Sequence, residues 1–154
     1  RALDYMRRVG HFEFGLDRRA IETDDGRTIA SVRELWEQGD EARGWARYWA
    51  ALYGWLADRL AADPVLRDAA LVVRYEDLCD DPRRTLERVL CHAELDDAGV
   101  TSSAERIHAP TYYRPSFTAD EERAIAEETH AVAERYRYVE DSAAPEAQPA
   151  VAVA

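Results

Sequence analysis

The chain has 154 residues, which is enough for one domain with a hydrophobic core. Its formal net charge of -11 and pI near 4.8 argue against a general nucleic-acid surface, because phosphate backbones attract clustered cations. All 20 basic residues are arginine, so any phosphate or sulfate that a cation holds in this chain is held by a guanidinium.

Nothing in the sequence predicts a membrane segment, an exported protein or a metal site. No apolar run approaches the roughly 20 residues that span a bilayer, and the start lacks the layout of a signal peptide, so we expect a cytoplasmic protein. Cys79 and Cys91 are too few for a disulfide framework and lack the spacing of metal ligands. Because the sequence starts at Arg1 without an initiator methionine, we expect it to be a piece of a longer protein.

The first part of the chain is predicted to be helical. We expect a helix early in residues 1–30, followed by a loop. Ser31 and Glu34 then fit a capping box for a short helix that ends near Gly39. The clearest pattern predicts a long helix over about 41–62, because large apolar residues recur there at helical spacing. These residues are Trp45, Trp49, Leu52, Leu56 and Leu60.

The middle of the chain is predicted to form a strand, a polar loop and a helix. The apolar run 69–73 is long enough for a strand that is buried on both faces, and the polar residues 74–77 follow it. Asp80 or Asp81 is the predicted N-cap of the next helix, with Pro82 in its first turn. The predicted inner face of that helix consists of Leu86, Val89, Leu90 and Ala93.

The last third is predicted to contain a short helix, a loop and a long helix. The polar stretch 94–103 leads into a short helix that reaches Ile107, and a loop over 108–117 follows. Thr118 and Glu121 form a second capping box, which opens a final helix with an acidic outer face. Its predicted inner face consists of Ile125, Thr129, Val132, Ala133 and Tyr136.

The elements together predict that residues 1–139 are the C-terminal part of one domain, mostly helical and with a single strand. A lone parallel-type strand has no partners, so it must join a sheet supplied from elsewhere. We therefore predict an α/β fold whose other strands lie upstream of this sequence. Residues 140–154 are small, include two prolines and lack a large apolar anchor, so we expect a disordered tail.

One segment carries a family resemblance. Residues 75–78 read Tyr-Glu-Asp-Leu, and Asp81, Pro82 and an amphipathic helix follow them. With its flanking features, the stretch 30–139 resembles the C-terminal half of bacterial-type sulfotransferases that use 3'-phosphoadenosine 5'-phosphosulfate. Arg137 departs from the family pattern, in which glycine is usual. The flanking features are Trp45, Tyr48, Trp49, Phe117, Thr118, Glu121, Glu122, Tyr136 and Tyr138.

The resemblance implies a P-loop α/β fold, a three-layer parallel sheet in the intact protein, and roles for two residues. In this family the tyrosine of the Tyr-Glu-Asp segment contacts the adenosine of the cofactor, so Tyr75 is predicted to bind it. From spacing alone, Tyr75 is better explained as a tyrosine packed under a loop, and the resemblance reverses that preference. Arg114 is predicted to reach the cofactor's 3'-phosphate, and a solvated loop arginine is the alternative.

No catalytic residue is predicted within the sequence. His92 and His130 lie on predicted helices, where a structural role is favoured, and His11 and His108 have no visible partner. In the family the base usually comes from the N-terminal half. The tryptophans of the 41–62 helix are expected to pack in the core, with one lining an acceptor pocket.

The sequence also lacks one part that the family needs. The 5'-phosphosulfate is held by a glycine-bearing turn after a strand, and the seven glycines here have no such context. We therefore expect a sulfotransferase portion that passes a sulfuryl group to a small hydroxyl or amine acceptor and is inactive without its N-terminal half. The alternatives are a non-catalytic acidic helical interaction domain and a fragment of another P-loop phosphotransferase. No nucleic acid, membrane or metal partner is expected.

Overall fold

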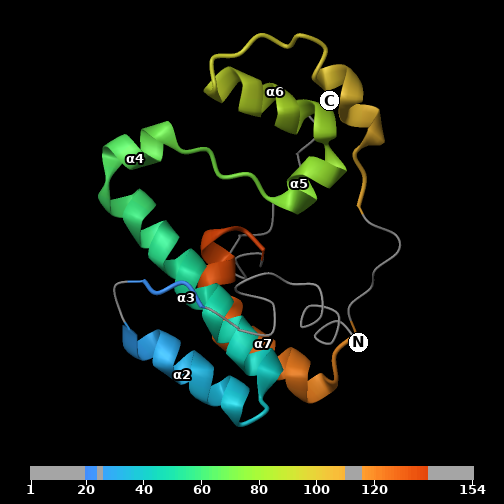
Figure 1. Cartoon of the computed structure of the whole chain (residues 1–154). Helices are drawn as coiled ribbons and strands as arrows, with labels where there is room; N and C mark the ends of the chain where they lie inside the picture. Colours follow the sequence, from blue (N-terminus) through green and yellow to red (C-terminus); the bar gives the residue numbers. More distant parts are fainter. Residues whose placement is uncertain (1–19, 24–25, 110–115, 139–154) are drawn as a thin grey trace, which may run out of the picture.

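The computed structural model of the chain describes residues 20–23, 26–109 and 116–138, which are mostly helical (Figure 1). No helix within these three stretches is long and apolar enough to cross a membrane. In chain order the elements are α2 (Gly26–Glu37), α3 (Glu41–Ala62), α4 (Pro64–Ala69), α5 (Tyr75–Asp80), α6 (Pro82–His92), the 3-10 helix η1 (Thr101–Arg106) and α7 (Ala119–Arg135).

The α/β fold class predicted from the sequence is wrong for the described part of the chain. Residue 69 ends a helix, and the backbone then runs extended, with Ala70 and Arg74 in the extended region. An extended segment becomes a strand only when a second segment satisfies its N–H and C=O groups, and no described segment does so. Neither the strand predicted over 69–73 nor the parallel sheet of a P-loop fold is therefore present among the described residues.

The polar residues that follow this segment form helix α5 and not the predicted loop. Arg74 precedes α5 and pairs with Asp77, three residues on, which is a spacing that a helical turn satisfies. Asp81 then ends α5 and caps α6, because its carboxylate accepts a hydrogen bond from the backbone N–H of Arg84 at 3.1 Å. Of the two predicted N-caps, Asp81 is right and Asp80 is wrong.

The long helix predicted over 41–62 is confirmed as α3. Asp40 caps its start by accepting from the backbone N–H of Arg43. Asp63 follows its last residue and caps α4, since the Asp63 carboxylate accepts from the N–H groups of Val65 and Leu66 at 2.9 and 3.1 Å. The sequence pattern predicts the end of α3 but not the short helix that follows it.

Helix α2 begins earlier than the predicted capping box. Ser31 lies inside α2, where its hydroxyl donates to the carbonyl of Thr28 at 2.8 Å, so Ser31 is not the N-cap. The predicted end is right, because Gly39 follows α2 with a φ of 84°, a left-handed conformation that favours glycine. The helix expected early in 1–30 and the tail expected over 140–154 fall outside the described residues.

The buried core lies where α2 crosses α3. Ile29, Val32 and Trp36 of α2 pack with Tyr48 of α3, and the Tyr48 hydroxyl accepts from the N–H of Ile21 at 2.8 Å. Helix α3 is flanked by α2 on one side and by α7 on the other (Figure 1). The other buried residues of α3 are small, which lets the helices approach closely. They are Ala42, Gly44 and Ala46.

Helix α7 begins at the predicted capping box and lies beside α3. The Thr118 hydroxyl accepts from the N–H of Glu121 at 3.3 Å, and the Glu121 carboxylate accepts from the N–H of Thr118 at 2.7 Å. All residues of the predicted inner face of α7 are buried or half-buried. The predicted acidic outer face needs a correction, because Glu127 and Glu128 turn toward α3.

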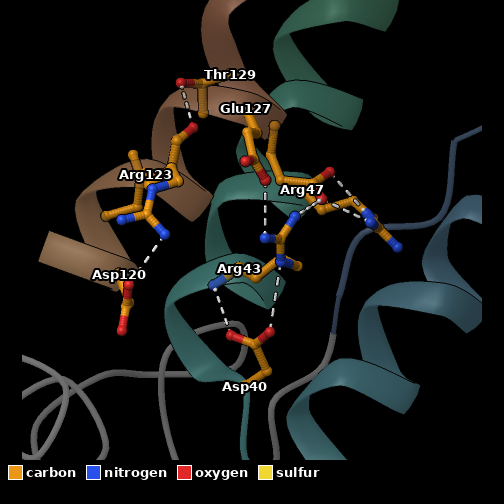
Figure 2. A network of polar contacts seen from close by, with 9 residues as sticks. Asp40, Arg43, Arg47, Asp120, Arg123, Glu127 and Thr129 are labelled. Carbon is orange, nitrogen blue, oxygen red and sulfur yellow. Dashed lines mark hydrogen bonds and ion pairs between the residues drawn. The ribbon is translucent and has the colours of Figure 1, made fainter.

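Two arginines of α3 join α7 through these carboxylates (Figure 2). Arg47 donates to both oxygens of Glu128 at 2.9 and 2.6 Å, and Arg43 donates to Glu128 at 3.0 Å and to Glu127 at 2.9 Å. Asp40 holds Arg43 from its other side. The Glu128 side chain is only 15% exposed. Hydrogen bonds from Arg47, and then from Arg43, lower the pKa of Glu128 below its ordinary value.

Replacing Gly44 by alanine should destabilise the protein although alanine is the better helix former. A Cβ at position 44 would lie 2.5 Å from Cδ1 of the buried Trp36 ring, which cannot swing away. We expect a net loss of about 1–2 kcal/mol in the free energy of unfolding. Gly54→Ala is the matched control, because its Cβ would meet Val132 at an ordinary 3.5 Å. This variant should gain up to about 1 kcal/mol in the free energy of unfolding. Urea unfolding of both variants compares them, and equal effects would contradict the packing of α2 on α3.

Replacing Glu128 by glutamine should lower stability in a pH-dependent way. The pKa of Glu128 is lower in the folded than in the unfolded chain, so its contribution is complete above its ordinary value of 4.5. That contribution disappears as the pH falls through the folded pKa. We expect Glu128→Gln to cost about 1–2 kcal/mol at pH 7 and much less near pH 3. Glu122→Gln, at an exposed position of the same helix, should cost far less, and a pH-independent Glu128→Gln effect would contradict the ion pairs.

Candidate functional site

An apolar pocket of about 490 Å³ lies where α3, α5 and α7 meet. Its wall is almost entirely hydrocarbon, and Glu76 is the one carboxylate that the described residues contribute to it. Such a cavity has the size and lining of a site for a small organic ligand. The lining residues are Ala42, Trp45, Ala46, Trp49, Glu76, Phe117, Ile125, Thr129, Ala133 and Tyr138.

The sequence of α3 explains why a hollow forms at this position. Trp45 and Trp49 lie one helical turn apart, and small alanines of α3 and α7 stand beside them, so the facing helices leave space between the rings. Neighbouring rings hold the two tryptophans in place. The Trp45 and Trp36 centroids are 4.6 Å apart, and those of Trp49 and Tyr53 are 4.9 Å apart.

The polar end of the pocket is formed by Glu76 and Tyr138. Burial raises the pKa of the Tyr138 phenol, and its hydrogen bond with the Glu76 carboxylate adds to that shift. Tyr138 is therefore a neutral phenol at physiological pH. Glu76 can accept a hydrogen bond from a ligand hydroxyl or amine, since a carboxylate offers several lone pairs.

Arg74 fixes the position of this polar end. Its guanidinium pairs with Asp77, donates to the backbone carbonyl of Arg137 and lies 5.4 Å from the centroid of the Tyr138 ring. The hydrogen bond from Arg74 is the main reason that the pKa of Asp77 is lowered. One side chain thus ties the start of α5 to the segment that follows α7.

The structure places the predicted site residues at different points. Tyr75 is the first residue of α5, its side chain is 55% exposed, and it does not line the pocket. Its neighbour Glu76 does line it. Arg114 falls outside the described residues. Of the tryptophans expected to pack in the core, Trp45 and Trp49 border the pocket, whereas Trp55 is 40% exposed and lies away from it.

The three described histidines offer no base at this pocket. His92 contacts the carbonyl of Ala69 at 3.1 Å, and His130 lies 3.1 Å from Glu134 on the same helix. His108 is exposed, and none of these three lines the pocket. His11 falls outside the described residues. In the described part of the chain no three His, Cys, Asp or Glu side chains are grouped as a metal site would require.

Sequence reasoning missed Glu76 and Tyr138 as pocket residues. The sequence does indicate the helical turn that contains Glu76, because Arg74 and Asp77 have the spacing of an ion pair across one turn of a helix. A helix that starts at residue 75 turns Glu76 toward α3, whereas a loop leaves its direction open. Tyr138 lies beyond the last helix, and only the folded chain brings it beside α5.

No protein-family model, curated protein or solved structure matches the chain. The function of the pocket therefore has to be inferred from its own residues and their geometry.

Proposed function

We propose that this chain is the C-terminal portion of a sulfotransferase that uses 3'-phosphoadenosine 5'-phosphosulfate and takes its acceptor in the apolar pocket beside Glu76. One observation supports this most. The pocket joins the Tyr-Glu-Asp segment, through Glu76, to the tryptophan-rich helix α3, and the segment before α7 and Tyr138 complete its wall. These are the segments by which the sequence resembles that family.

In this proposal the acceptor is an apolar molecule with one hydroxyl or amine. Its apolar body lies against Trp45 and Trp49, and its polar group donates a hydrogen bond to Glu76. Tyr75, one residue away and more than half exposed, stacks on the adenosine of the cofactor outside the pocket. Arg114 binds the 3'-phosphate.

The reaction is a transfer of a sulfuryl group. The acceptor oxygen or nitrogen forms a bond to sulfur, the bond from sulfur to the 5'-phosphate oxygen breaks, and the acceptor proton passes to a base. The residues that hold the phosphosulfate, and that base, belong to a further N-terminal segment in this proposal, because no glycine-bearing anion loop occurs in the sequence. The present residues position the two substrates and do not transfer sulfate alone.

A second candidate is a non-catalytic acidic helical interaction domain. The observation that favours it is the all-helical arrangement of the described residues with its own buried cluster, Ile29, Val32, Trp36 and Tyr48. An interaction domain needs no small-molecule pocket. Binding of an apolar phenol therefore separates the two candidates.

Filling the pocket should abolish acceptor binding. Thr129 lines the pocket from α7, so Thr129→Phe places a ring inside it, whereas Ala126→Phe places the same ring on the exposed side of the same helix. We expect 2-naphthol to change the tryptophan fluorescence of the natural protein and of Ala126→Phe in a saturable way. Thr129→Phe should lose at least about tenfold in affinity. Equal affinity in all three proteins would contradict the acceptor site and favour the interaction domain.

Replacing Tyr75 by alanine should weaken the binding of the nucleotide and leave the binding of the acceptor unchanged. Loss of one stacking ring typically costs about 1–3 kcal/mol, so the dissociation constant of 3'-phosphoadenosine 5'-phosphate should rise at least about fivefold in calorimetric titration. Trp55→Ala, which removes a 40% exposed ring from α3 away from the pocket, is the control. If Tyr75→Ala leaves the nucleotide constant unchanged, the adenosine assignment is wrong.

A further inference from the structure

A second cavity of about 490 Å³ lies beyond Arg74, between the C-terminal half of α3, α6 and the end of α7. Among the described residues, four arginines line it, Arg74, Arg88, Arg135 and Arg137, together with one carboxylate, Asp77. Its opposite wall is apolar and comes mainly from α3. The chain has a net charge of -11, whereas the lining of this cavity is positively charged.

Two of these arginines are held in place by other groups. Arg74 pairs with Asp77 and donates to the carbonyl of Arg137. Arg135 pairs with Asp58 at 2.7 Å and donates to the carbonyl of Gly54 at 3.4 Å. Both guanidiniums are therefore fixed at the cavity, and Asp77, the one carboxylate that the described residues give to the lining, already pairs with Arg74.

The guanidiniums of the other two arginines are not held in place by other groups of the described structure. Among residues 20–23, 26–109 and 116–138, the guanidinium of neither Arg88 nor Arg137 makes a hydrogen bond or ion pair, although the backbone carbonyl of Arg137 accepts from Arg74. Both lie close enough to Asp77 for their charges to add to the effect of the Arg74 hydrogen bond, which is the main cause of its lowered pKa. Arg74, Arg88 and Arg137 thus place three positive charges around one carboxylate, and a bound anion would offset the excess.

The backbone conformation of Arg137 is a further indication that the cavity binds a ligand. Arg137 has a φ of 61°, the left-handed conformation in which helices usually end on glycine because a Cβ is strained there. Backbone strain of this kind is often found at binding sites, although Glu94 and Ala98 also have a positive φ in this chain. Here it brings the Arg137 side chain to the cavity lining.

We propose that this second cavity binds a phosphate monoester that carries a small apolar group. The arginines would hold the phosphate oxygens through charge-assisted hydrogen bonds, which the guanidinium fork suits, and the apolar group would lie against α3. A phosphate monoester is close to a dianion at neutral pH and matches the positive lining better than a singly charged ester does. This site is separate from the acceptor pocket and does not depend on the sulfotransferase proposal.

Calorimetric titration of the whole chain with phenyl phosphate, phenyl sulfate and phenol tests the proposal. Phenyl phosphate should bind most tightly, and its affinity should fall below pH 6 as the phosphate gains a proton. Arg137→Gly should lower the affinity for phenyl phosphate at least about fivefold. It should also raise the melting temperature by roughly 3–6 °C, because glycine adopts this φ without strain. Arg88→Gln should lower the affinity for phenyl phosphate by a similar factor.

Arg123→Gln is the charge-matched control. Arg123 sits near the start of α7, pairs with Asp120 and does not line the cavity, so its loss should leave the affinity within about twofold. The proposal is overturned if Arg137→Gly binds phenyl phosphate as well as the natural protein does. It is also overturned if Arg123→Gln weakens binding equally, or if phenol or phenyl sulfate binds as tightly as phenyl phosphate.

Discussion

The side-by-side packing of α3 and α7 is the constraint on which the rest of the structure depends. The two helices run in the same direction, since Arg43 near the start of α3 meets Glu127 and Asp58 near its end meets Arg135. The carboxylate of Glu128 accepts from two arginines at once, which fixes how far α7 can slide along α3. At the far end, the Tyr136 hydroxyl donates to the carbonyl of Tyr53 at 2.9 Å.

Both cavities follow from this packing. The apolar pocket lies along the first half of α3 and the arginine-lined cavity along its second half, where Arg74 and Asp77 form part of the wall. Arg74 is shared between the two, because it steadies Tyr138 on one side and lines the cavity on the other. A displacement of α7 along α3 would therefore alter both sites at once.

The parts of the fold that were predicted correctly are those set by local chemistry. The capping box at Thr118, the cap at Asp81 and the apolar spacing of α3 each depend on residues within a few positions, so the sequence contains them. The strand over 69–73 failed because apolar β-branched residues favour a strand only when a partner is present. At the candidate site, one pocket-lining tryptophan was predicted and two line the pocket, whereas Tyr138 meets Glu76 only through the tertiary structure.

Site-resolved native-state hydrogen exchange tests this dependence most directly. If α3 and α7 form the stabilising unit, their central amides exchange only through global unfolding, and they share one free energy of opening and one denaturant dependence. The extended residues 71–74, which have no ladder partner among the described residues, should exchange orders of magnitude faster. Amides of α7 that exchange through a separate, lower-energy opening while α3 stays protected would contradict the account, as would slow exchange at 71–74.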